Sequence, residues 1–185
     1  MIQFGVWSFI FFVLNATNAY NIYFYRGSFI DRSIYTDFLT HLQDRLPDSN
    51  VEHQDYITRN EFPKDSILIG HSFGGFVSLL YTMKNPEKVK ACVLVNSHFN
   101  HNFQMPYLRV SMHKIKQPVL CIFTNYDEQL PCEKVFQDWD VALKKQMKNK
   151  QFELYEGTHF SLFTHRTHVN LLGDSIVKFI QKVDE

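Results

Sequence analysis

A chain of 185 residues, 45% of them hydrophobic, is long enough to bury one core and too short for two ordinary domains. Lysine plus arginine and aspartate plus glutamate each number 19, so no broad positive field is available to attract nucleic acid or an anionic membrane. The three cysteines are an odd number and are widely spaced, so no disulfide framework is indicated, and Cys92 and Cys121 lie in apolar runs typical of buried thiols. We therefore expect one domain that acts on small or neutral partners. The composition does not indicate an oligomeric state.

The chain begins with an uncharged, aromatic-rich run at 4–14, followed by small and polar residues up to Ala19. This run is too short to span a bilayer but has the length of the apolar region of a secretory signal peptide. Against that interpretation, no lysine or arginine precedes Arg26. Two expectations remain open: residues 1–19 are a signal peptide that leads to secretion, or they pack on the fold of a cytoplasmic protein. In both cases we expect the folded domain at 20–185 and no transmembrane span.

Strand-like and helix-like segments alternate along the rest of the chain, which predicts repeated crossovers and an α/β fold with a mostly parallel central sheet and helices on both faces. A buried strand is expected at 21–25. The helix after it has apolar residues at helical spacing from Ile34 to Leu46, with Ser33 as its N-cap and Pro47 at its end. The later strands are expected at 51–57, 66–69, 90–95, 119–124 and 152–155, and the later helices at 76–84, 134–148 and 170–183.

A G-x-S-x-G pentapeptide at 70–74 lies between an apolar strand and a helix. A serine hydroxyl that attacks a carbonyl must project from a sharp turn, in which side chains two positions away would collide unless they are hydrogen. Gly70 and Gly74 meet this demand, and the helix N-terminus offers N–H groups to a developing oxyanion. Ser72 is therefore the candidate nucleophile. The alternative interpretation is an ordinary glycine turn before a helix.

A serine nucleophile needs a histidine to take its proton and a carboxylate to orient that histidine. Asp127 and His159 each follow a predicted strand, so both are expected at the carboxyl edge of the sheet, where catalytic groups gather. Glu128 is the alternative acid. His71 is adjacent to Ser72 and is expected to stabilise the turn, because successive side chains diverge there. A metal site built from three other histidines lacks ordinary spacing and a nearby carboxylate; these are His98, His101 and His113.

Three separated motifs in the order Ser, Asp, His resemble the α/β-hydrolase superfamily, from residue 21 to the C-terminus. The resemblance implies a minimal α/β-hydrolase fold, with Ser72 as nucleophile, Asp127 as acid and His159 as base, and with no cofactor or metal. It also implies an oxyanion hole formed in part by the backbone N–H of Phe73.

The second oxyanion donor of the family comes just after an early strand that ends in His-Gly or a similar pair. In this chain Arg26 and Gly27 occupy that place, which makes the backbone N–H of Ser28 the candidate. Arg26 departs from the histidine that is commonest there.

The implied reaction transfers an acyl group to water through an acyl-enzyme on Ser72. The resemblance suggests a carboxylic ester or thioester, as in small esterases, lipases and thioesterases. The segment 96–117, where many relatives insert a lid, is short here, so an open site for an acyl chain or aromatic ester is expected. Its candidate rim residues are Phe99, Phe103, Met105, Pro106 and Tyr107.

Two other functions remain open. One is a catalytically inactive relative that binds a ligand or partner, because the first two strands of the usual sheet are absent. The other is an amidase or peptidase that uses the same triad.

Overall fold

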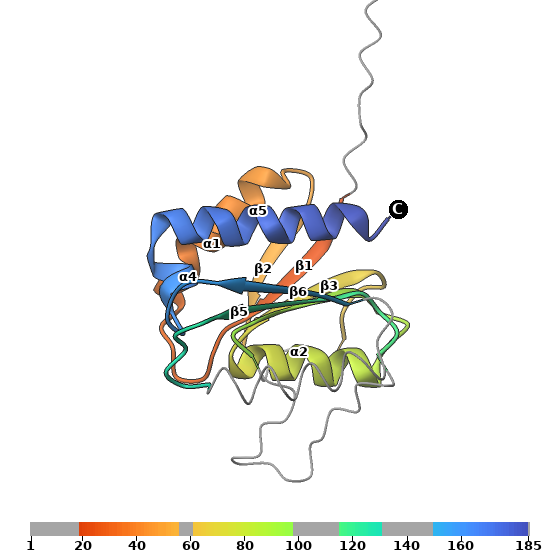
Figure 1. The fold of residues 1–185 in the computed structure, drawn as a ribbon. Coiled ribbons are helices and arrows are strands. Elements are labelled where there is room, and N and C mark those ends of the chain that lie inside the picture. Colours follow the sequence, from red (N-terminus) through yellow and green to blue (C-terminus); the bar gives the residue numbers. More distant parts are fainter. Residues whose placement is uncertain (1–18, 56–60, 98–114, 131–149, 185) are drawn as a thin grey trace, which may run out of the picture.

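The computed structural model describes residues 19–55, 61–97, 115–130 and 150–184, and Figure 1 shows the remainder as a grey trace. Its centre is a six-stranded sheet in the order β2-β1-β3-β4-β5-β6, and every neighbouring pair is parallel. The strands are β1 (Asn21–Tyr25), β2 (Asn50–Gln54), β3 (Ser66–His71), β4 (Val89–Val95), β5 (Val119–Thr124) and β6 (Lys150–Tyr155). This topology confirms the predicted parallel α/β sheet.

Burial separates the inner strands from the edges. All residues of β3 and β5 are buried, as expected for strands covered on both faces, whereas β2 and β6 expose part of their residues at the two ends of the strand order. An edge strand carries more polar residues, so the sequence of β2 gives a weaker apolar signal than those of the buried strands. The structure begins β2 at Asn50 and ends it at Gln54; part of the predicted segment 51–57 lies beyond the described residues.

Helices cover both faces of the sheet, as predicted. In Figure 1, α1 (Thr36–Arg45) and α5 (Arg166–Lys182) lie on one side, and α2 (Phe73–Lys84) lies on the other. Each side has its own apolar core, and both Cys92 and Cys121 are fully buried in the α2 core, as expected. Within the described ranges, no helix has the length and apolar character needed to cross a membrane.

The helix boundaries differ from prediction at the starts of α1, α2 and α5, and α2 begins at Phe73 rather than at 76. A short 3-10 helix, η1 (Arg32–Tyr35), precedes α1, and its cap is the carboxylate of Asp31, which accepts from the Ser33 N–H at 2.8 Å. A single-turn helix, α4 (Ser161–Thr164), precedes α5, which begins at Arg166 rather than at 170. The predicted helix at 134–148 lies outside the described part of the chain.

Candidate active site

Ser72 occupies a turn of one residue between β3 and α2. The predicted turn at 70–75 is tighter than expected, because β3 stays paired with β4 through His71 and α2 begins at Phe73. Ser72 has φ 53° and ψ −122°, a strained backbone for a residue other than glycine. Its own N–H donates to the Val95 carbonyl at 2.9 Å, which ties the turn to the sheet. The Ser72 side chain is partly exposed, whereas His71 is buried.

The two glycines of the pentapeptide are required by close backbone contacts. A Cβ on Gly70 would lie 2.3 Å from the carbonyl oxygen of Gly74, and a Cβ on Gly74 would lie 2.3 Å from the carbonyl oxygen of Tyr25. The turn is therefore pressed against the end of β1 as well as against itself. The prediction that neither position tolerates a side chain is confirmed. A side chain at Gly70 would collide with Gly74, whereas a side chain at Gly74 would collide with the end of β1.

Asp127 and His159 form a buried pair. Their Oδ2 and Nδ1 atoms lie 2.6 Å apart, and their side chains are 2% and 0% exposed. Oδ1 of the same carboxylate accepts the backbone N–H groups of Gln129 at 2.8 Å and Leu130 at 2.9 Å. Because a carboxylate with these partners is an acceptor, Nδ1 of His159 carries the proton and Nε2 carries the lone pair in the neutral ring.

Nε2 of His159 carries the lone pair of the neutral ring. Among the residues that the structure describes, the buried Nε2 has no hydrogen-bond partner, so no bond joins it to the Ser72 hydroxyl here. His159 nevertheless lies close to the turn that carries Ser72. The ring of His71, the residue before Ser72, has its centroid 4.7 Å from that of His159. Hydrogen bonds between a nucleophile and its base are often long before substrate binds.

Glu128, the alternative acid, contacts a different part of His159. Its Oε2 accepts the backbone N–H of His159 at 3.2 Å, whereas Asp127 receives the ring. The structure thus separates the two carboxylates, which the sequence left as alternatives, into one partner for the imidazole and one for the backbone.

The loops that carry Asp127 and His159 are joined by hydrogen bonds. Tyr126 N–H donates to the Gly157 carbonyl at 2.9 Å, and Gly157 N–H donates to Oδ1 of Asn125 at 3.0 Å. Gly157 has φ 148°, and a Cβ there would lie 2.0 Å from Oγ of Ser161. Neither Asn125 nor Gly157 was a candidate from sequence, although a glycine two residues before the histidine is the signal that marks this turn.

The loop after β1 passes directly beside Ser72. A Cβ on Gly27 would lie 3.3 Å from Cβ of Ser72, and the Gly27 N–H already donates to the Tyr35 hydroxyl at 3.1 Å. Ser28, the candidate oxyanion donor, follows in a turn with Phe29, which has φ 60° and is fully exposed.

The Arg26 side chain contacts both ends of this loop's surroundings, at Ile30 and at Asp55. Its Nη1 donates to the carbonyl of Ile30, and its Nε lies 3.5 Å from Oδ1 of Asp55 beyond β2. Arg32 also pairs with Asp55, so two arginines share one carboxylate. The departure from the family's usual histidine therefore has a structural consequence: the arginine side chain spans the loop from its first residue to its end.

Several candidates from the sequence lie outside the described residues. These are the histidines at 98, 101 and 113 and the candidate rim residues between 99 and 107. Within the described ranges, no group of three His, Cys, Asp or Glu side chains is arranged to hold a metal ion.

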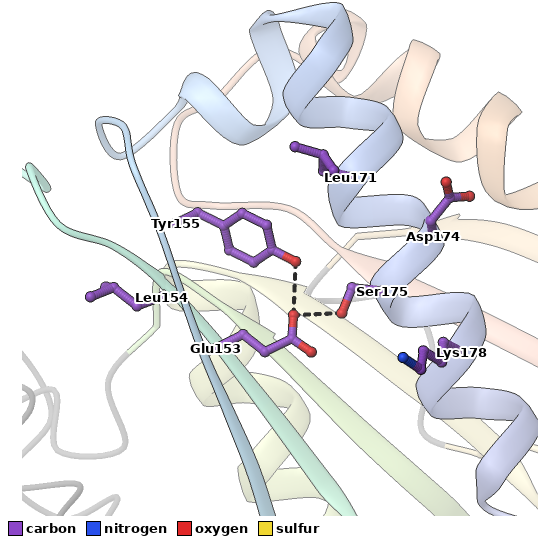
Figure 2. A pocket seen from close by; sticks show the side chains of 7 residues that line it. All are labelled: Glu153, Leu154, Tyr155, Leu171, Asp174, Ser175 and Lys178. Carbon is purple, nitrogen blue, oxygen red and sulfur yellow. Dashed lines mark hydrogen bonds between the residues drawn. The ribbon is translucent and has the colours of Figure 1, made fainter.

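A separate hollow of about 500 Å³ lies between β6 and α5. Figure 2 shows Glu153 at its centre, with Oε2 accepting the Tyr155 hydroxyl at 2.8 Å and the Ser175 hydroxyl at 2.5 Å. This carboxylate joins the edge strand to the helix. None of the seven lining residues is Ser72, Asp127 or His159, so the hollow is distinct from the candidate active site.

Comparisons with known proteins agree on the architecture. Residues 43–120 match a family model described as alpha/beta hydrolase fold, and no curated protein matches the chain. A solved alpha/beta hydrolase enzyme from the metagenome of sediments of the Mar Chica lagoon, Morocco, is 16% identical with a TM-score of 0.66, over 89% of this chain and 93% of that one. Est1E from Butyrivibrio proteoclasticus is 17% identical with a TM-score of 0.65, over 92% and 90%. A thermophilic esterase from Thermogutta terrifontis is 11% identical with a TM-score of 0.65, over 89% and 90%.

Proposed function

This chain is a protein of the α/β-hydrolase fold, and from that premise we propose that it is a serine hydrolase that cleaves a carboxylic ester or thioester through an acyl-enzyme on Ser72. The observation that carries the proposal is the buried Asp127–His159 pair, with 2.6 Å between Oδ2 and Nδ1 and with Nε2 unpartnered among the described residues. An imidazole in this state can accept a proton from a serine hydroxyl.

In the proposed reaction, Ser72 Oγ attacks the substrate carbonyl while its proton passes to His159 Nε2. Asp127 stabilises the imidazolium, and the backbone N–H groups of Phe73 and Ser28 stabilise the oxyanion. His159 then protonates the leaving group, and water hydrolyses the acyl-enzyme with the same histidine as base. No step needs a cofactor.

The chemistry of the three residues supports an acyl substrate such as an ester or thioester. An acyl carbonyl is the electrophile that a serine attacks when a histidine accepts its proton and a carboxylate orients that histidine. An amide substrate would use the same residues, so parallel assays on an ester and its amide decide between an esterase and an amidase.

The test is labelling of the folded protein with a fluorophosphonate probe. We expect the wild type to be labelled and Ser72→Ala to remain unlabelled. Ser175→Ala is the matched control, because this serine donates to Glu153 away from the site, and it should label like the wild type. Absence of label on folded wild-type protein would reject the serine hydrolase and favour the inactive, ligand-binding relative.

We also propose that residues 1–19 are a secretory signal peptide. Among the described residues, which begin at 19, Tyr20 contacts the segment around β2: its N–H donates to Oγ of Ser49 at 3.1 Å and its carbonyl accepts from the Asn50 N–H at 2.8 Å. Cleavage after Ala19 would leave both contacts intact. Sequencing the N-terminus of the protein from its native source should yield Tyr20, and a start at Met1 would refute this route.

A further inference from the structure

The buried His71 ring connects the three loops of the candidate site. Its Nε2 lies 3.1 Å from the backbone oxygen of His159, and its Nδ1 lies 2.8 Å from the Tyr35 hydroxyl. The same hydroxyl accepts the N–H of Gly27, one residue before the candidate oxyanion donor Ser28. The proposed reaction uses none of these hydrogen bonds, yet each ends on a segment that must be placed accurately.

Chemistry allows only one direction for this chain of hydrogen bonds. A carbonyl oxygen only accepts, so Nε2 of His71 must carry the proton. Burial, together with the neighbouring His159, lowers the pKa of His71 well below its usual value, so the ring is neutral and Nδ1 accepts from Tyr35. The Tyr35 oxygen still has a lone pair for the Gly27 N–H. Every proton in the chain therefore has an acceptor.

The His159 carbonyl receives a second buried donor. Nδ2 of Asn96 lies 2.9 Å from it, while Oδ1 of Asn96 accepts the Thr124 N–H at 2.9 Å. Asn96 follows β4 and has φ 43°, a conformation that asparagine tolerates better than most residues. Two strand ends, of β3 and β4, thus hold one carbonyl. Its position fixes the peptide from which the His159 imidazole projects.

Resting on the proposed function, we propose that His71 is a positioning residue. It fixes the positions of the His159 imidazole and of the loop at Gly27 and Ser28 relative to the Ser72 hydroxyl. It touches neither the substrate nor the proton in transfer. Its effect comes through distance, because a displacement of about 1 Å at a reacting group can cost about 100-fold in rate.

Two substitutions of His71 distinguish the effect of its hydrogen bond to the His159 carbonyl from the effect of its side-chain volume. In His71→Gln, the amide nitrogen is three bonds from Cβ, as Nε2 is, so it can still donate to the His159 carbonyl. In His71→Asn, the amide ends at the distance of Nδ1 and cannot. With p-nitrophenyl acetate, we expect kcat of His71→Asn to fall by about 10- to 100-fold with KM nearly unchanged, and His71→Gln to recover most of that loss.

The fluorophosphonate labelling rate should follow the same order, with thermal melting measured for each variant. If the wild type is labelled and folded His71→Asn is labelled equally fast, the inference is wrong while the serine hydrolase stands. If His71→Asn and His71→Gln lose equal activity, the donor to His159 is not what matters, and the inference is again wrong. If folded wild type is not labelled, the proposed function fails and takes the inference with it.

A further measurement uses the wild-type protein and needs neither a variant nor an activity assay. Nitrogen-15 NMR of the histidine rings should show His71 as the neutral tautomer with the proton on Nε2, unchanged from pH 5 to 8. A proton on Nδ1, or titration of His71 in this range, would overturn the inference even if the variants fail to fold.

Discussion

At the scale of single residues, His159 is held on almost every side. Its backbone N–H meets Glu128, its carbonyl meets His71 and Asn96, and its Nδ1 meets Asp127. Within the described part of the chain, Nε2 has no hydrogen-bond partner and can therefore accept a proton. Such an arrangement restricts the ring to one tautomer and one orientation, which is what a general base needs.

Replacing the two neighbouring acids should therefore have unequal effects. Asp127→Asn can present an N–H to Nδ1, which favours the wrong imidazole tautomer, and we expect kcat on p-nitrophenyl acetate to fall by about 10⁴-fold. Glu128→Gln keeps an oxygen that accepts the His159 N–H, so kcat should change by less than about threefold. Equal losses in the two folded variants would contradict the assignment of Asp127 to the ring.

At the scale of elements, the site exists because every strand of the sheet points the same way. The loops that follow β1, β3, β4, β5 and β6 leave the sheet at one edge, which brings residues 26–30, 72, 96, 127 and 159 together. Backbone contacts then link neighbouring loops. The loop after β1 differs, because it is held through the Arg26 side chain, which reaches both Ile30 and Asp55.

This brace can be tested with a conservative change. Arg26→Lys keeps the charge but has a single nitrogen, which cannot reach the Ile30 carbonyl and Asp55 together as the guanidinium does. We expect kcat to fall by about 10-fold with little change in KM, because the loop carries the candidate oxyanion donor rather than a substrate-binding side chain.

Arg45→Lys is the matched control, since Arg45 forms an ion pair with Asp174 between α1 and α5. Its kcat should stay within about twofold of wild type, as expected when an exposed pair is weakened. Wild-type kcat in Arg26→Lys would show that the loop needs no such brace.

At the scale of the whole molecule, the buried histidine at the centre of the site links stability to pH. Burial, followed by the electrostatic influence of the neighbouring His159, holds the pKa of His71 well below 6.5 in the folded protein. The unfolded chain restores the ordinary value, so below about pH 6.5 the unfolded state binds a proton that the folded state excludes. Stability should therefore decrease as the pH falls through this range and should gain nothing from His71 above it.

Urea unfolding between pH 5 and 8 measures this effect. Below pH 6.5, His71 should lower the free energy of unfolding with a slope that approaches about 1.4 kcal/mol per pH unit. His53, whose pKa is also lowered by burial, contributes in the same direction. His71→Gln should reduce the slope, and replacement of the exposed His165 by Gln should leave it unchanged. The same slope in wild type and His71→Gln would contradict the neutral, buried state of His71.

The sequence by itself determined the order of elements, the parallel sheet and the turn at Ser72. Those signals are local: apolar periodicity within a strand or helix, a proline that ends a helix, and glycines within two residues of a serine. They predicted the bounds of β1 and β5 correctly. They were weaker at β2, an edge strand, and at the starts of α2 and α5, where no capping side chain marks the boundary.

Only the tertiary structure decided which groups meet around His159. Asp127 and Glu128 are adjacent and chemically alike, and their separate partners depend on how the loops after β5 and β6 join. Tyr35 and Asn96 carry no local motif, yet each contacts a residue more than 30 positions away. Such contacts follow from strand order and register, which place distant loops at one edge of the sheet and which no short window of sequence records.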